Sequence, residues 1–194
     1  MPTPLELAVK LRERFGELIS APTEFRGEVA LDVCDPERIA DVCAFAKGQL
    51  GFDFLLDLSG VDNYGADPRW TVVYELFGLA HRCHLRLRTS VSEEKSELPT
   101  VSTVWRTANW HEREAYDLLG IRFRGHPDLR RILMWEGYPY FPLRKDFPLA
   151  GKSSEIPEVA FTRSAPLEGG PFVTTAGGAD TADREPRARA GRED

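Results

Sequence analysis

The chain contains little cysteine. It has three cysteines among 194 residues, and no two of them are separated by only two residues. A disulfide framework and a zinc site are therefore not expected. An iron–sulfur cluster is ordinarily held by four thiolates, so this chain alone cannot supply one. We interpret Cys34, Cys43 and Cys83 as reduced residues that serve as small apolar side chains.

Long apolar runs are also lacking. No stretch approaches the roughly 18 apolar residues needed to cross a bilayer. The first residues include neither a basic segment nor an apolar one of the kind found in signal peptides. We therefore expect the protein to stay in the cytoplasm and to reach a membrane only through a partner.

An excess of positive charge is lacking as well. The formal net charge is −6, which argues against bulk binding of nucleic acid, because such proteins present a basic surface. The remaining composition, 42% hydrophobic and 29% charged residues, is that of an ordinary globular protein. The length suits one domain, or one domain with a tail.

Hydrophobic periodicity predicts an α+β domain over residues 1–135. Thr3, Pro4 and Glu6 have the pattern of a helix start with a capping box. Asn109 and Glu112 suggest a second capping box, before a helix that ends at Gly120. The predicted strands are residues 23–33, 52–58, 70–77 and 81–89, and the predicted helices begin near residues 4, 36, 99, 110 and 128. These strands would form a four-stranded mixed or antiparallel sheet flanked by helices.

The sequence changes in character after residue 135. Residues 137–149 contain three prolines and four aromatic residues, a density of proline that forbids a long helix and favours extended chain. We interpret residues 136–175 as a long extended C-terminal arm that lies on a partner, and residues 176–194 as a polar, disordered end. The alternative, a merely flexible tail, fits less well because large apolar residues recur along the arm. The predicted arm anchors are Phe147, Ile156, Val159, Phe161, Leu167, Phe172 and Val173.

Acidic residues cluster in the predicted helix at 110–119, so catalysis has to be considered. Glu112 and Glu114 would point about 200° apart on a helix and could not share a substrate. Arg113 and Asp117 lie four residues apart on one face and could pair with each other. A buried or interfacial network of ion pairs is favoured over a catalytic pair.

The histidines do not form a metal site. His111 and Glu112 resemble the start of a zincin helix, but that motif needs a second histidine where this chain has Ala115. His81 and His84 would lie on opposite faces of a strand. His126 could titrate near neutral pH, but a structural role is favoured over proton transfer.

Several segments resemble the thirty-kilodalton subunit, the C-type subunit, of proton-translocating NADH:quinone oxidoreductase, respiratory complex I. The central signature has three parts, Glu112-Arg113-Glu114, then Asp117-Leu118-Leu119-Gly120, then His126, Arg130, Ile132 and Leu133. Gly60-Val61-Asp62 upstream and Pro142-Leu143-Arg144-Lys145-Asp146 downstream also match the family pattern. The resemblance spans roughly residues 50–150.

This resemblance implies a non-catalytic structural subunit in the peripheral arm of the complex, on the cytoplasmic side of the inner membrane in bacteria. It implies no cofactor in this chain, with FMN, the iron–sulfur clusters and quinone held by other members of the complex. The implied partners are the large D-type subunit, which forms part of the quinone chamber, and the neighbouring iron–sulfur subunits. The chain would support electron transfer from NADH to quinone, coupled to proton translocation.

The signature residues would act by stabilising this fold and its contact with the D-type subunit. Our hypothesis is that they form ion pairs within this fold and across to the D-type subunit, and that Arg144, Lys145 and Asp146 fix where the arm leaves the domain. The residues assigned to these ion pairs are Glu112, Arg113, Glu114, Asp117, His126, Arg130 and Arg131.

Three alternatives remain open from the sequence. A related membrane-bound [NiFe] hydrogenase, or a ferredoxin- or F420-linked complex, contains subunits with the same signature. A nucleic-acid-binding module is another alternative, because arginines recur along the chain and arginine also suits phosphates. Those arginines and one lysine are Arg82, Arg86, Arg88, Arg122, Arg124, Arg130, Arg131, Arg144 and Lys145. An independent enzyme is the third alternative, for which the sequence offers no credible active site.

Overall fold

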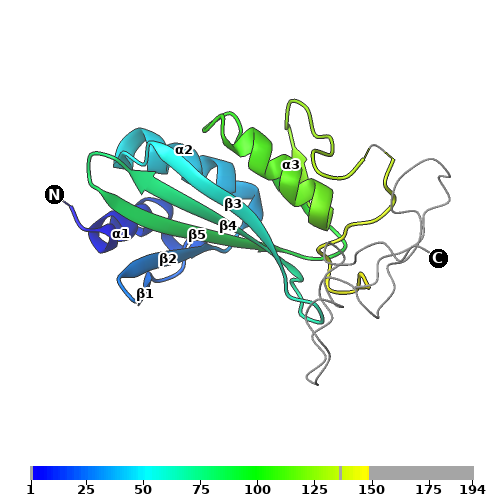
Figure 1. The fold of residues 1–194 in the computed structure, drawn as a ribbon. Coiled ribbons are helices and arrows are strands. Elements are labelled where there is room, and N and C mark those ends of the chain that lie inside the picture. Colours follow the sequence, from blue (N-terminus) through cyan, green and yellow to red (C-terminus); the bar gives the residue numbers. More distant parts are fainter. Residues whose placement is uncertain (1, 136, 149–194) are drawn as a thin grey trace, which may run out of the picture. The chain divides into compact units, whose positions relative to one another are not determined.

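A computed structural model of the chain describes residues 2–135 and 137–148 (Figure 1). The chain divides into two compact units, Met1–Glu136 and Gly137–Asp194. The elements of the first unit are α1 (Pro4–Phe15), β1 (Thr23–Phe25), β2 (Glu28–Val33), α2 (Ile39–Leu50), β3 (Phe54–Asp62), β4 (Trp70–Gly78), β5 (Cys83–Val91), β6 (Glu97–Pro99), α3 (Ala108–Leu119) and β7 (Arg122–Arg124). Short 3-10 turns at Gly16–Leu18 and Pro36–Arg38 complete it.

The main sheet has five strands in the order β1-β2-β5-β4-β3. Strand β2 runs parallel to β5, and the other pairs are antiparallel, so the sheet is mixed. The predicted class, an α+β fold with a mixed sheet flanked by helices, is confirmed. The predicted hairpin of residues 70–77 and 81–89 is the β4–β5 pair, with Trp70 opposite Val91.

The fifth strand arises because the segment predicted as one strand, residues 23–33, folds as two. Arg26 and Gly27 have φ angles of 52° and 81°, and they reverse the chain between β1 and β2. Two consecutive positive φ angles make a tight turn whose twist matches that of the flanking strands. Val29, Leu31 and Val33 are buried as predicted, whereas Phe25 is 68% exposed.

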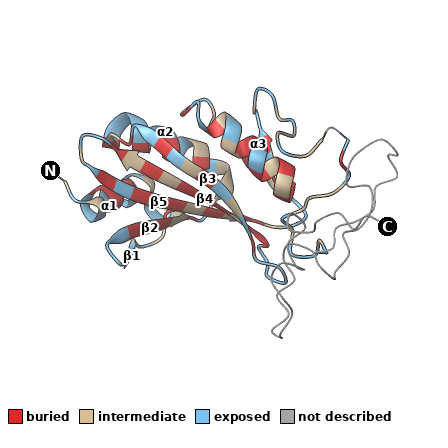
Figure 2. Ribbon diagram, in the orientation of Figure 1, coloured by how far each residue is buried: buried red, intermediate tan, exposed pale blue. Residues whose placement is uncertain are grey.

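The helices cover one face of the main sheet. Buried and half-exposed residues alternate along β4 and β5, as Figure 2 shows. The buried face of β4 carries Trp70, Val72, Tyr74 and Leu76, which belong to one core with α1, α2 and α3. Gly60 on β3 faces Leu119 of α3 so closely that a side chain at this position would collide with it.

Two of the predicted helices are not formed. Residues 97–99 form strand β6, which pairs in parallel with β7, and turns follow from residue 102 to 104. The chain near Asp128 makes turns and bends instead of a helix, and the backbone amides of residues 132–134 bond to a side chain of α3. The predicted capping box at Thr3 and Glu6 is formed, with both reciprocal hydrogen bonds present.

Candidate docking site: the charged helix and the segment it holds

The charges of α3 point in different directions. Glu112 and Asp117 are fully buried and Arg113 is 7% exposed, while Glu114 is exposed. Glu112 and Glu114 therefore lie on opposite sides of the helix, as helical geometry requires. They cannot act together on one substrate.

Asp117 holds the backbone that follows β7. Its Oδ2 accepts hydrogen bonds from the backbone N–H groups of Ile132, Leu133 and Met134, at 2.9, 2.7 and 2.9 Å. Its Oδ1 accepts a hydrogen bond of 2.6 Å from the guanidinium of Arg131. Successive amides that converge on one oxygen form an anion-binding concavity, here filled by a side chain of the same protein.

These hydrogen bonds also set the charge of Asp117. Burial alone would raise its pKa, but the hydrogen bonds from Met134, Leu133, Arg131 and Ile132 outweigh that effect and hold the pKa below its usual value. The carboxylate is therefore charged at neutral pH.

Arg113 binds the backbone carbonyl groups of the same segment. Its Nε donates a hydrogen bond of 3.1 Å to the carbonyl of Arg130, and its Nη2 donates one of 3.3 Å to that of Arg131. Arg113 and Asp117 were expected to be able to pair with each other, and this was wrong. Both side chains face the same strip of backbone, where the guanidinium bonds to carbonyls and the carboxylate bonds to amides. We call Arg113, Asp117 and residues 130–134 the clamp.

Glu112 faces the interior instead of capping the helix. Its carboxyl group accepts hydrogen bonds from the Thr100 hydroxyl and from the backbone N–H of Val101, the latter at 2.7 Å. Burial raises the pKa of Glu112 to about 7, although these hydrogen bonds oppose the shift. The helix starts at Ala108 after Thr107, with no hydrogen bond from a capping side chain, so the predicted capping box at Asn109 is wrong.

His126 has a structural geometry. Its side chain is fully buried, and its Nδ1 accepts a hydrogen bond of 3.0 Å from the backbone N–H of Asp128. That bond requires the proton to be on Nε2, which lies 3.1 Å from the carbonyl of Asn109 and donates to it. Nε2 is also 3.8 Å from the Glu112 carboxyl group. The ring thus links the turn after β7 to the start of α3.

Arg130 differs from the other signature residues because it lies at the surface. It forms an ion pair of 2.9 Å with Asp128, and the two side chains are 72% and 53% exposed. Exposed pairs of this kind contribute little to stability. The backbone of Arg130, rather than its side chain, is part of the clamp.

The start of the predicted arm is described from Gly137 to Pro148. Tyr140 contacts the rings of Tyr138 and Phe147, with centroids 5.6 and 6.0 Å apart, and the Arg144 guanidinium lies 4.4 Å from the centre of the Phe141 ring. Arg144 and Asp146 line a hollow of about 210 Å³ with Tyr140, Phe141 and Phe147, and Lys145 and Asp146 are exposed. The other predicted anchors, Ile156, Val159, Phe161, Leu167, Phe172 and Val173, lie outside the described residues.

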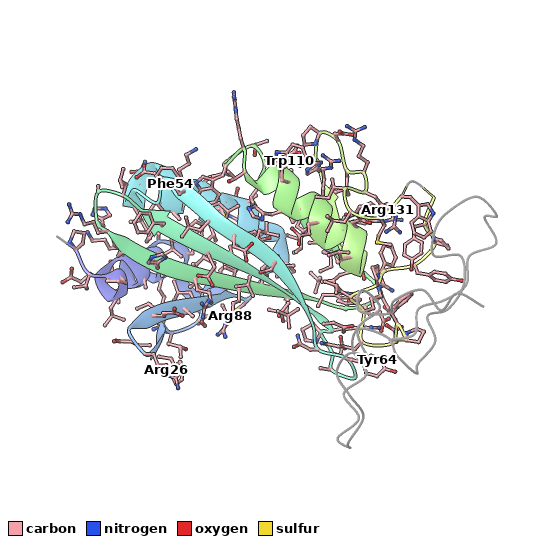
Figure 3. All side chains as sticks on the ribbon, viewed as in Figure 1. Arg26, Phe54, Tyr64, Arg88, Trp110 and Arg131 are labelled. Carbon is pink, nitrogen blue, oxygen red and sulfur yellow. The ribbon has the colours of Figure 1, made fainter. Side chains whose placement is uncertain are left out.

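Sequence reasoning missed two surface features of this site. Trp110 on α3 is 63% exposed and lies under the Arg113 guanidinium, which is 5.0 Å from the ring centre (Figure 3). Leu133 is 61% exposed, although its backbone is held by Asp117. An aromatic residue on the polar face of a charged helix was the available signal for Trp110, because Trp110 and Glu114 share that face.

The arginines of the proposed nucleic-acid-binding face are largely engaged with carboxylates. Arg86 pairs with Glu75 and Glu28, and Arg88 pairs with Asp32 at 2.8 Å. Arg124 and Arg131 also have acidic partners. These pairs argue against a surface selected to bind phosphates.

Within the described ranges, 2–135 and 137–148, no three histidine, cysteine or acidic side chains come together as a metal site. None of the helices found there is long and apolar enough to cross a membrane.

Comparison with known proteins identifies the family. Residues 33–153 match the profile of the respiratory-chain NADH dehydrogenase 30 kDa subunit. The chain belongs to this family. A C-type subunit of the NADH-quinone oxidoreductase of Rhizobium etli is 47% identical over 148 residues, which cover 75% of this chain and 78% of that protein. The C-type subunit of Geotalea uraniireducens is 46% identical over 147 residues, or 76% of this chain and 89% of the relative.

Solved structures agree with membership of the 30 kDa subunit family. A trypsin-resistant fragment of Nqo5 is 35% identical with a TM-score of 0.58, and the match covers 66% of this chain and 100% of the fragment. A chain of an archaeal membrane-bound sulfane sulfur reductase has the same fold, at a TM-score of 0.64 and 21% identity over 74% of this chain and 85% of that one. The chain is therefore assigned to the family of C-type subunits of NADH:quinone oxidoreductase, respiratory complex I, as the resemblance of its sequence implied.

Proposed function

We propose that this chain is a non-catalytic structural subunit of the peripheral arm, on the cytoplasmic side of the membrane. It docks on the D-type subunit and on neighbouring iron–sulfur subunits, and it supports electron transfer from NADH to quinone coupled to proton translocation. FMN, the iron–sulfur clusters and quinone belong to these and other partners in the complex.

The observation that carries this proposal is the clamp. Two charged side chains of the signature bind backbone groups. Asp117 binds three successive amides, and Arg113 binds the two carbonyls that precede them. This use of charge fixes the backbone of residues 130–134, near the end of the first unit and shortly before the arm begins. A fixed attachment point of this kind supports a role in which the arm binds a partner.

A rigid structural subunit can support catalysis by keeping the distances between redox centres constant. Electron transfer to quinone requires that the clusters and the quinone chamber stay in a fixed arrangement, and preorganised scaffolds achieve this without chemistry of their own. The role predicts that damage to the clamp lowers the amount of assembled complex, while each assembled complex keeps its turnover. Normal assembly with lost turnover would contradict it.

The test is a pull-down of the tagged chain from gently solubilised membranes, followed by mass identification of the partners and an assay of NADH:quinone activity. Recovery of a large assembly with this activity supports the proposal. Recovery of a hydrogenase-type large subunit without NADH oxidation would instead assign the chain to a related complex. A lone protein, or one with bound RNA, would contradict the proposal.

A further inference from the structure

The buried arginines of the first unit differ in their partners. Arg69 has a side chain 5% exposed and forms two hydrogen bonds with Asp62, at 2.8 and 2.9 Å, and an ion pair of 2.6 Å with Glu93. Arg131, 14% exposed, pairs with Asp117. Arg113 is also buried, with 7% of its surface exposed. No carboxylate pairs with it among the residues that the structure describes.

A buried cation that bonds only to carbonyls is incompletely compensated. Two carbonyl dipoles offset part of the cost of removing the guanidinium from water, but buried charges in proteins are ordinarily paired with an opposite charge. In the described part of the chain, the Nη1 amino group of Arg113 has no hydrogen-bond acceptor, since Nε and Nη2 make the two bonds to the backbone. One edge of the guanidinium is thus available, and an Arg fork accommodates a carboxylate there in two parallel bonds.

The surface beside this edge has the features of a binding hot spot. The Trp110 ring is 63% exposed, and the Arg113 guanidinium covers one of its faces at 5.0 Å. Trp and Arg are the residue types most enriched where binding energy concentrates, and a ring held by a cation loses little freedom on binding. Arg106, in the turn that precedes α3, is exposed and has no acidic partner among the described side chains.

We propose that Arg113 and Trp110 form the central contact with the D-type subunit, in which a carboxylate of that partner binds the free edge of Arg113 and an apolar pocket of the same partner receives the Trp110 ring. The inference rests on the proposed function for the identity of the partner. Charge complementarity supplies the chemistry, because the Arg113 guanidinium covers the exposed Trp110 ring and has no carboxylate partner in the described ranges, while the exposed Arg106 precedes Trp110 by four residues.

This contact also links docking to the clamp. Arg113 bonds to the carbonyls of Arg130 and Arg131 through one edge of its guanidinium, and it would bond to the partner through the other. A carboxylate on the free edge fixes the orientation of the guanidinium and so keeps its other donors directed at the two backbone carbonyls. Docking of the domain and fixation of the outgoing segment would then stabilise each other.

The direct test places a photo-crosslinking amino acid at position 110 of the tagged full-length chain within the assembled complex. Phe25 offers a matched control position, because it is 68% exposed and also lies under a guanidinium, that of Arg26 at 5.1 Å. We expect a crosslink to the D-type subunit from position 110 and none from position 25. A crosslink from position 110 to another protein, to lipid or to nothing would overturn the inference.

The second test measures how firmly the chain is retained in the complex. Trp110→Ala and Arg113→Gln should each weaken retention by about 30-fold, the effect of losing one hot-spot residue, whereas Phe25→Ala should not. Trp110→Ala removes a side chain that makes no hydrogen bond to the clamp, so it separates docking from folding of the segment. Retention of both variants as firmly as Phe25→Ala would refute the inference while leaving the proposed function intact. Failure of the unmodified chain to copurify with the D-type subunit would contradict the proposed function itself.

Discussion

The carboxylate of Asp117 accepts a hydrogen bond of 2.7 Å from the backbone of Leu133, whose side chain is nevertheless 61% exposed. A surface segment is thus held from beneath by a buried charge. The backbone of this segment is bound by two residues of α3, Asp117 through its amides and Arg113 through its carbonyls. Loss of the Asp117 charge should therefore loosen the segment.

Asp117→Asn should destabilise the domain by about 3 kcal/mol, because it leaves the partly buried Arg131 guanidinium without its counter-ion. The amides of residues 132–134 should lose part of their protection against hydrogen exchange, because the neutral oxygen of asparagine accepts hydrogen bonds more weakly than a carboxylate does. Chemical denaturation of the full-length chain and hydrogen exchange measure the two effects. Asp41→Asn is the control, since the Arg38–Asp41 pair is exposed and should contribute less than about 1 kcal/mol. Equal losses in the two variants would show that Asp117 does not hold the segment.

Glu112 should make stability depend on pH between about 4.5 and 7. Its pKa is raised from 4.5 in the unfolded chain to about 7 in the fold, so folding favours the protonated form. The associated stability is fully present below pH 4.5 and is lost as the pH rises through 7. The full loss should amount to about 3 kcal/mol, of which about 2 kcal/mol falls above pH 5.5.

The measurement compares unfolding free energies of the native chain and Glu112→Gln at pH 5.5 and pH 8. The amide can still accept from Val101, so this variant should show little change over the interval. Burial raises the pKa of Cys43 and of Tyr74 above their usual values of 9.0 and 10.0, so these groups weaken the fold only in more alkaline solution. A native chain that is equally stable at both pH values would disprove the assignment.

Local patterns in the sequence were sufficient for much of the fold. Alternation of apolar and polar residues along 70–77 and 81–89, with a short turn between them, predicts the β4–β5 pair. This signal depends only on residues that are neighbours in the sequence. The same kind of pattern led to the prediction of one strand where the structure has β1 and β2. The alternation of Phe25, Gly27 and Val29 continues across the turn between them. The backbone reverses there because Arg26 and Gly27 have positive φ, which periodicity does not reveal.

The candidate site was harder to predict for a related reason. Helical geometry correctly separates Glu112 from Glu114. It does not show that Asp117 binds amides 15 to 17 residues later, or that Arg113 binds carbonyls in the same segment. These partners are backbone groups, which every residue has, so no spacing of residue types marks them. Thr100 and Val101, the partners of Glu112, were missed because the chain there was taken for a helix.

Arg69→Lys should destabilise the domain by about 2 kcal/mol, the contribution of one hydrogen bond to a charged group. Arg69 joins the two ends of the β3–β4 connection, because it binds Asp62 through two nitrogens and packs over the rings of Tyr64 and Trp70. Lysine keeps the charge but cannot form the paired bonds or stack in the same way. Arg38→Lys is the matched control on an exposed pair. Thermal unfolding measures the stability of both variants. A loss of stability in Arg69→Lys no larger than in Arg38→Lys would refute the structural role of Arg69.

Gly60→Ala should destabilise the contact between β3 and α3. A Cβ at this position would lie 2.4 Å from Cδ1 of Leu119 and 3.1 Å from Cδ1 of Ile121. Leu119 is 3% exposed, so it has little space to move away, and overpacking of this kind costs about 1–3 kcal/mol.

Two further variants separate this collision from a general effect of replacing glycine. Gly48→Ala, in α2, meets nothing within 4 Å and should raise stability by about 0.5–1 kcal/mol, because alanine favours the helix. Leu119→Ala creates a cavity, and the Gly60→Ala methyl group then has room, so the double variant should lose less than the sum of the two single losses. Strict additivity in chemical denaturation would show that Gly60 and Leu119 are not in contact.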